Sequence, residues 1–413
     1  MTELTNSSGR PKLMALEGLR GLCALSILVS HISHDSTGFR TGGMSHFPGY
    51  VPAFISYFGG IGVLVFFVLS GFVIGYTNQG CFNRANVVLY LKRRFIRLYP
   101  IYLLVSLISF AVANEFGDVT KLLGHLFFLQ TWLVDNVSSN GVLWTLHLEA
   151  GFYLLYLFIW WRPVYLRLWL AVCAGACFFS PFCDIHLLLV LGYFYLWLLG
   201  LKLAQSVSGS GELPNDTDPS MRRAFWLSLF VSIAYITSSV PEILVSRYQV
   251  SGHGQLSLLS VFMLSGLLVT LVSVPLGQID WRHFYLSLTW ATTSSALAVA
   301  WAVYSGNWNL IYSYQMASIY LLLAGGSLVL SPAKIEISGL LSRAAWWGSI
   351  SYSLYLIQNP IERTVFPLIS KSSSIEVWWS VSFAVFMIVV VTSCFLELVL
   401  QPRIANFLRK KLL

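Results

Sequence analysis

Two ionisable side chains, Arg20 and His31, stand near the ends of the aliphatic stretch LRGLCALSILVSH. Eleven residues of an α-helix turn through about 1,100°, so both side chains share one helix face, about 16 Å apart along the axis. Glu17, three residues before Arg20, lies near that face. A histidine can take a proton from a hydroxyl and an arginine can hold an anion, which predicts a functional polar stripe. The alternative is that Arg20 pairs with Glu17 to fix helix packing and that His31 is a hydrogen-bonded core residue.

A further acidic group lies in LWTLHLEAGFYLLY, where Glu149 follows His147 by two residues. A carboxylate inside a membrane span needs a partner. A pair between Glu149 and His31 would orient the imidazole and raise its basicity. Glu149 could instead pair with a buried cation such as Arg20, and the sequence leaves this choice open.

Three arginines, Arg93, Arg94 and Arg97, follow one another closely in YLKRRFIRLYP. Guanidinium groups match phosphate oxygens, so these side chains are candidates for binding the phosphates of a cytoplasmic donor. The alternative is that they orient the chain or contact anionic lipid. The preceding stretch GGIGVLVFFVLSGFVIGY contains Ser70 and several glycines, which permit close helix packing.

The composition indicates which elements must position these residues. Hydrophobic residues make up 56% of the 413 residues and charged residues only 10%, against roughly 25% in soluble domains. Apolar runs of about 20 residues span a bilayer as helices. We therefore expect an all-α polytopic membrane protein, with residues 13–401 forming a single bundle of about 10–12 transmembrane helices. The expected spans are 13–34, 54–77, 97–114, 141–161, 166–181, 185–204, 223–241, 256–277, 284–304, 309–331, 346–368 and 376–401.

The distribution of basic residues predicts the orientation of this bundle. If the N-terminus is cytoplasmic and the loops alternate, 19 of the 25 Lys and Arg residues fall inside and five outside, as the positive-inside rule requires. Both termini are then cytoplasmic. Segment 1–12 is expected to be a disordered N-terminus, 206–222 a flexible cytoplasmic linker, and 402–413 a basic cytoplasmic tail.

Five motifs in this order resemble those of acyltransferase family 3, whose members move acyl groups, often acetyl, onto sugars and other acceptors. They are Arg20 with His31, the stretch FFVLSGF that begins at Phe66, RRFIRLYP, LWTLHLEAGFY, and WGSISYSLYLIQNP, which contains Tyr352 and Gln358. Together they cover residues 13 to about 365. Two positions depart from the family pattern: Gln358 stands where the family usually has histidine, and His147 where it commonly has serine.

The resemblance implies that acyl-CoA, with acetyl-CoA favoured, is a co-substrate, and that no cofactor or metal is bound. The phosphates of acyl-CoA would contact Arg93, Arg94 and Arg97, and its pantetheine arm would pass Arg20. His31, supported by Glu149, would be the catalytic base, although an acyl-histidine intermediate stays open. The candidate pocket residues are Glu17, Ser70, His147, Tyr352 and Gln358.

The resemblance also implies a carbohydrate or lipid-linked saccharide as acceptor, membrane lipid as the surroundings, and the bacterial cytoplasmic (inner) membrane as the location. Nucleic acid is not an expected partner, and the oligomeric state is left open. The main alternative is a twelve-span secondary transporter of sugars or small metabolites. Its typical acid–arginine–glycine loop is missing from GYTNQGCFNRANVVLYLKRR, and the two halves of the chain show no similarity.

Overall fold

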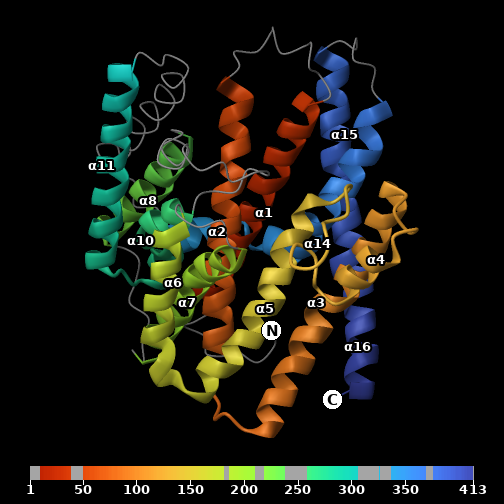
Figure 1. The fold of residues 1–413 in the computed structure, drawn as a ribbon, viewed down its shortest axis with the longest axis horizontal. Coiled ribbons are helices and arrows are strands. Elements are labelled where there is room, and N and C mark those ends of the chain that lie inside the picture. Colours follow the sequence, from red (N-terminus) through yellow and green to blue (C-terminus); the bar gives the residue numbers. More distant parts are fainter. Residues whose placement is uncertain are drawn as a thin grey trace.

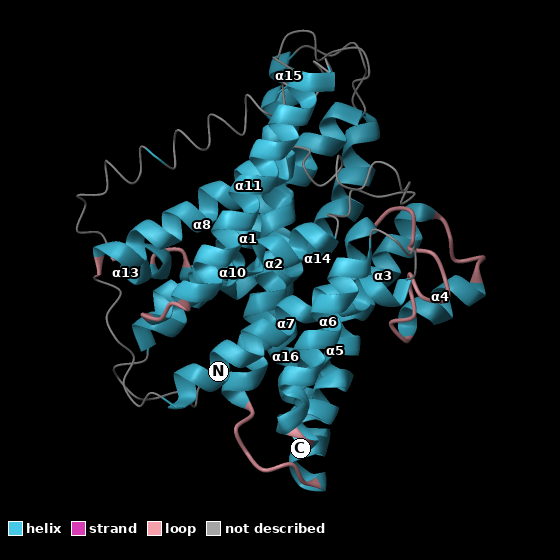
Figure 2. Cartoon of the chain, turned by 60° about the vertical axis from the view of Figure 1, so that its left-hand side comes forward, coloured by secondary structure: helices cyan, strands magenta, loops and turns pink. Residues whose placement is uncertain are grey.

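The computed structural model describes residues 10–38, 50–180, 186–209, 218–237, 258–305, 325, 336–368 and 375–412. Within these ranges the regular structure is helical, and one isolated bridge between Gln130 and Val134 is the exception (Figures 1 and 2). The main helices are α1 (Arg10–Gly38), α2 (Tyr50–Thr77), α3 (Arg84–Ala113), α4 (Val119–Leu126), α5 (Trp144–Trp161), α6 (Leu166–Phe179), α7 (His186–Gly209), α8 (Pro219–Thr237), α10 (Leu258–Ser273), α11 (Trp281–Ser305), α13 (Ile337–Ser342), α14 (Ala345–Val365), α15 (Ile375–Cys394) and α16 (Gln401–Leu412).

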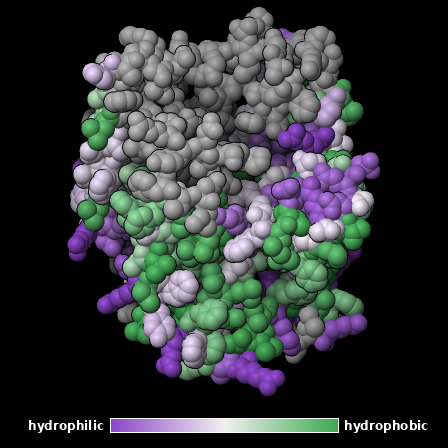
Figure 3. Space-filling view, in the orientation of Figure 1, coloured by the Kyte–Doolittle hydropathy of each residue, from purple (hydrophilic) through white to green (hydrophobic). Residues whose placement is uncertain are grey.

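Seven segments of the described chain are long and apolar enough to cross a membrane. They are Leu13–Ser33, Gly59–Thr77, Arg84–Ala113, Gly141–Trp161, His186–Ser208, Leu258–Leu276 and Glu376–Lys411. Helices α8, α11 and α14 have 19, 25 and 21 residues, which is similar to the length of these seven segments. The expected all-α polytopic membrane protein is thus confirmed. Figure 3 shows a broad hydrophobic area on one face, with hydrophilic residues at its lower edge and around α4.

Several predicted boundaries differ from the structure. Helix α3 begins at Arg84 rather than residue 97, because Asn83 caps it by accepting a hydrogen bond from the Asn86 backbone N–H. The predicted linker is shortened, since α7 continues to Gly209 and α8 starts at Pro219. Residues 402–412 of the predicted basic tail are helical, and so are residues 10–12 of the segment predicted to be a disordered N-terminus. The predicted span 309–331 and residues 1–9 lie outside the described residues, apart from residue 325, which is described as helical.

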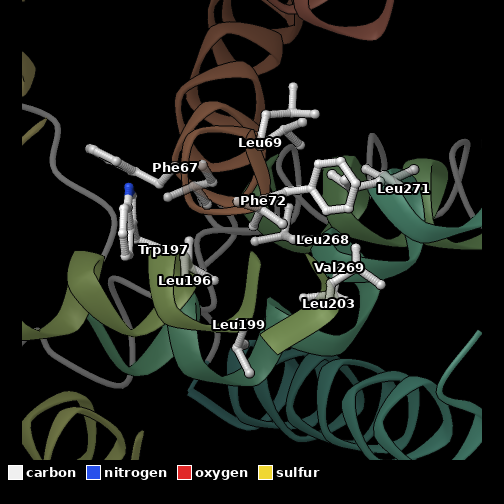
Figure 4. Close-up of a cluster of buried hydrophobic side chains, with 14 of the residues drawn as sticks. Phe67, Leu69, Phe72, Leu196, Trp197, Leu199, Leu203, Leu268, Val269 and Leu271 are labelled. Atoms are coloured by element: carbon white, nitrogen blue, oxygen red, sulfur yellow. The ribbon is translucent and has the colours of Figure 1, made fainter. Parts of the chain in front are cut away.

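The packing of α2 on α7 and α10 forms one of two apolar cores (Figure 4). Phe67 and Phe72 of α2 lie beside the fully buried Trp197 of α7 and Leu268 of α10. A Cβ atom on Gly71 would collide with the Trp197 carbonyl, so glycine permits the backbones of α2 and α7 to meet. This confirms the close helix packing expected around Ser70.

A second apolar core joins α1, α3, α14 and α15. Helices α1, α2 and α14 lie at the centre of the bundle in both ribbon views. Apolar burial therefore fixes α1 between two packed groups of helices, and the polar face of α1 is turned towards α14.

Candidate active site

The polar face of α1 packs along α14 in parallel register. Arg20 contacts Gly348 and His31 contacts Asn359, and both pairs are separated by 328 residues. Equal separations at two points eleven residues apart mean that the two helices run in the same direction, side by side. Gly348 allows this approach, because a Cβ atom there would collide with the carbonyl of Glu17. The prediction that Arg20 and His31 share a face is confirmed, and that face lies inside the bundle.

The contact between α1 and α14 is called the α1–α14 seam here, and its lower end is the end nearer the N-terminus of α1. Arg20 is held firmly at this lower end. Its Nη2 forms a 2.6 Å ion pair with Glu17 Oε2 and donates to the Gly348 carbonyl, while Nε donates to Ser351 Oγ at 2.9 Å. Both charged side chains are about three-quarters buried. The predicted pairing of Arg20 with Glu17 as a packing device is therefore present. Nη1 takes part in none of these three contacts.

His31, at the upper end of the seam, is oriented by an amide side chain. Its Nδ1 lies 2.9 Å from Oδ1 of Asn359. An amide oxygen only accepts hydrogen bonds, so Nδ1 of His31 is the donor in this contact. The sequence interpretation did not single out Asn359, although it directly follows Gln358 in the last motif. Its signal was the spacing from Gly348, which repeats the spacing from Arg20 to His31.

Glu149 is anchored on α5 by two hydroxyls. Ser70 Oγ donates to Glu149 Oε1 at 3.1 Å, and the Tyr153 hydroxyl donates to the same oxygen. Trp197 Nε1 in turn donates to Ser70 Oγ at 3.2 Å. Glu149 also interacts electrostatically with Arg20 and Tyr352. These contacts place Glu149 near the level of Arg20, whereas the defined orienting contact of His31 is with Asn359.

The three clustered arginines occupy different surroundings. Arg93 is exposed. The guanidinium of Arg94 lies 5.9 Å from the ring centres of both Tyr90 and Tyr153. Arg97 forms a 2.9 Å ion pair with Glu397 and lies over the ring of Tyr352 at 5.4 Å. Arg94 and Arg97 therefore turn towards the bundle and Arg93 away from it.

Glu397 is a buried acid that the sequence interpretation missed. It lies in a π-helical segment, Phe395–Leu400, between α15 and α16. Such wide turns are rare in proteins, and those that occur are often found at functional sites. Its Oε2 pairs with Arg97, while the buried Oε1 has no hydrogen-bond partner among the described residues. A sequence pattern that reads as a continuous apolar span gives no sign of a π-turn, although an acid at that depth is itself a signal.

With this geometry in place, sequence comparisons identify the family. The model of acyltransferase family 3, described as an acyltransferase domain, matches residues 14–397. This chain belongs to that family. Acyltransferase MdmB of Streptomyces mycarofaciens is 29% identical over 164 residues, which cover 37% of this chain and 40% of that protein. The chain thus spans about two fifths of the length of this curated relative. No solved structure gives a significant match.

The two departures from the motifs of acyltransferase family 3 have distinct surroundings. Gln358 is fully buried, and neither of its amide atoms has a hydrogen-bond partner in the described part of the chain. His147 is buried beneath Thr131, whose Oγ1 lies 3.0 Å from its ring nitrogens, and it stacks on His186. The sequence-predicted residues therefore form an inner group around Arg20, Glu149 and Tyr352, and separate contacts at His31 and His147.

Proposed function

We propose that this protein is a membrane-bound acyltransferase that moves an acyl group, with acetyl favoured, from cytoplasmic acyl-CoA to a hydroxyl of a carbohydrate or glycoconjugate. Its location would be the bacterial cytoplasmic membrane. Membership of acyltransferase family 3 supports the reaction class and argues against the transporter alternative. The observation that carries the proposal is the Asn359 contact, in which Nδ1 of His31 is the donor; in the proposed reaction Nε2 is the basic nitrogen.

The proposed reaction assigns a role to each end of the seam. Phosphates of the donor contact Arg93, Arg94 and Arg97, because guanidinium groups bind phosphate oxygens well. His31 Nε2 takes the proton of the acceptor hydroxyl while the oxygen of that hydroxyl attacks the thioester carbonyl carbon. The C–S bond then breaks, and the imidazolium returns the proton to the CoA thiolate.

In the proposed reaction Glu149 and Arg20 do not carry out the chemistry themselves but help to form the polar surroundings of the donor arm. The Ser70 and Tyr153 hydroxyls hold the Glu149 carboxylate in the polar wall, within electrostatic range of Arg20. In the proposal Arg20 keeps α1 on α14, and its Nη1 is available to the donor arm. Direct support of His31 by Glu149 stays a prediction.

The test measures the transfer of radiolabelled acetyl from acetyl-CoA to a crude glycan and glycolipid extract by protein in nanodiscs. We expect His31→Ala to lower the rate about 10²- to 10⁴-fold, the usual contribution of a general base. His283→Ala, at a half-buried histidine of α11 that contacts Ser265, should leave the rate unchanged. Transfer by His31→Ala at the wild-type rate would refute the assignment.

Two further measurements separate parts of the proposal. Label that stays on wild-type protein in the absence of acceptor, and that His31→Ala does not acquire, would show the acyl-histidine route instead of direct transfer. The Arg93→Ala/Arg94→Ala double variant should weaken CoA binding by calorimetry. Unchanged CoA affinity would refute the phosphate site.

A further inference from the structure

An open cavity of about 380 Å³ lies in the segment between α3 and α5, and its lining includes no residue of α1 or α14. Its lining includes Asp118, Lys121, Thr131, Trp132 and Asp135. The volume is at the small end of the range for sites that bind small molecules, about 300–1,000 Å³. In the predicted orientation this segment is extracytoplasmic, on the side from which the proposed acceptor would arrive.

The walls of this cavity are held by an organised set of hydrogen bonds. Asp118 caps α4 by accepting from the Lys121 backbone N–H at 2.9 Å. The fully buried His125 links α4 to the loop that follows it: Nδ1 lies 2.9 Å from the Lys121 carbonyl of α4, and Nε2 accepts from the Val137 N–H at 3.2 Å. Burial lowers the pKa of His125, which favours the neutral ring that this bridge requires. The backbone around the cavity is therefore held in place by contacts within the protein.

The charges around the cavity favour one class of ligand. Glu115 Oε2 lies 2.7 Å from Lys121 Nζ and offsets its charge. Hydrogen bonds from Lys121 and Ser138 outweigh the effect of burial and lower the pKa of Glu115, so this pair stays ionised at neutral pH. The carboxylates of Asp118 and Asp135 then leave the cavity negative. Such a site accepts hydrogen bonds from hydroxyl or ammonium groups and repels anions.

Trp132 adds an aromatic surface to these acceptors. Its side chain is 50% exposed although it lines the cavity, and its ring lies 5.3 Å from the ring of His186, centre to centre, at an interplanar angle of 76°. A half-exposed indole ring offers an apolar face to the C–H groups of a sugar ring and attracts cations. Carboxylates for the hydroxyls and an aromatic face for the ring together fit a carbohydrate better than an apolar ligand or a phosphate.

The cavity is tied structurally to the proposed site of chemistry. Thr131 lines the cavity and contacts His147 of α5, two residues before Glu149. At the start of α5, Asn140 Nδ2 donates to the Leu356 carbonyl of α14 at 3.1 Å. Gly141 lies against Asn359, since a Cβ atom there would be 3.8 Å from its Nδ2. One short segment therefore links the cavity to the residue that orients His31.

We propose that this cavity is the acceptor subsite, which binds a neutral or amine-bearing sugar ring and excludes anionic sugars. The inference rests on the proposed acyltransferase function, and names the substrate class that the function leaves open. The sugar could be free or attached to a lipid, since the cavity-lining Leu133 is 75% exposed and nearby Phe127 is 70% exposed.

The test uses full-length protein in nanodiscs and saturation-transfer NMR. The probes are methyl glycosides of glucose, galactose and mannose, with their amino and uronic acid counterparts. We expect binding of at least one neutral or amino sugar and no binding of the uronates. An alkyl glycoside of the same sugar, used below its micelle concentration, should bind more tightly only if the natural acceptor is lipid-linked, and equally if it is soluble.

Variants connect the binding to the cavity. Trp132→Ala should weaken sugar binding by about tenfold or more, as loss of an aromatic anchor does, whereas Trp290→Ala, at a similarly exposed tryptophan of α11, should not. In Asp118→Asn/Asp135→Asn, which keeps the cap of α4, uronate binding should appear. The control Asp280→Asn removes the charge of a different cap, at the His283 N–H, and should not admit uronates.

Two outcomes would overturn the inference: no neutral or amino sugar binds to the wild type, or the Trp132 and Asp variants bind sugars as the wild type does. Failure of the proposed function gives a different result. In that case sugars bind and respond to the variants, but CoA neither binds to the protein nor supports acetyl transfer.

Discussion

The two ends of the α1–α14 seam hold their ionisable residues in different ways. At the lower end Arg20 makes three contacts, two of them across to α14, where the helix backbones meet at Gly348. At the upper end an amide oxygen fixes the tautomer of His31. The difference is that Arg20 joins α1 to α14 through several charged and polar contacts, whereas His31 is oriented by a single amide side chain. In the proposed function the two halves of a single sequence motif therefore have separate tasks.

The largest effect should come from breaking the lower end. Arg20→Ala leaves Glu17 and two α14 acceptors without their donor, so we expect a loss of about 2–4 kcal/mol in unfolding free energy, as for broken buried ion pairs. Arg20→Lys keeps the charge but cannot reach all three acceptors, and should lose less. Thermal unfolding in detergent measures this. If Arg20→Ala unfolds at the wild-type temperature, Arg20 does not fasten the helices.

The next effect tests the upper end. Asn359→Ala removes the group that fixes the His31 tautomer, so transfer should fall about tenfold to a hundredfold with little change in unfolding temperature. The pH profile of kcat should shift as well, because Asn359 acts through His31. In the His31→Ala background the same change should cost nothing more, since residues that act as a unit are not additive. Full additivity would show that Asn359 acts independently.

A smaller effect is expected at the arginine cluster. Glu397→Gln keeps the shape of the side chain but removes the charge that now neutralises Arg97. If Arg97 binds donor phosphates, the affinity for CoA should rise severalfold, most clearly at low ionic strength. Isothermal calorimetry against Glu376→Gln, an exposed acid at the start of α15, gives the comparison. Weaker CoA binding would mean that Glu397 positions Arg97 instead.

The smallest effect concerns the outer loop and pH. The folded loop disfavours the charged form of His125, so the unfolded loop binds more protons as the pH falls below the usual histidine pKa of about 6.5. Stability from His125 is complete above that pH and is lost as the pH falls from there towards the lowered pKa. Hydrogen exchange of Val137 should therefore be less protected at pH 5 than at pH 7.5, after correction for intrinsic rates. Equal protection would contradict the bridge.

The sequence predicted much of the fold because the bilayer restricts the choices. An apolar run of membrane-spanning length forms an α-helix, because a helix satisfies all its backbone hydrogen bonds within the segment. The periodicity of that helix then places Arg20 and His31 on one face. The start of α3 was missed because the basic residues Lys92, Arg93 and Arg94 separate its first two turns from the apolar run that follows Arg97. Sequence periodicity also cannot show which helix α1 will face, since several apolar helices offer similar surfaces.

The partners of the site were harder to predict than its residues. Glu149 was a candidate partner of His31, whereas the defined contacts give Asn359 to His31 and two hydroxyls to Glu149. Partners of this kind depend on helix rotation and depth, which composition does not determine. Glu397 was missed because a π-turn changes the direction of a side chain without a local sequence signature.

The parallel pairing of α1 with α14 has a consequence for how the protein is made. The two helices are 328 residues apart at their contacts, and chains are synthesised at about 5–20 residues per second. Helix α1 therefore enters the membrane tens of seconds before its partner exists. Glu17 is one turn from Arg20 on the same helix, so their ion pair does not depend on the presence of another helix. An ion pair within α1 thus lowers the cost of placing Arg20 in the bilayer before α14 has been synthesised.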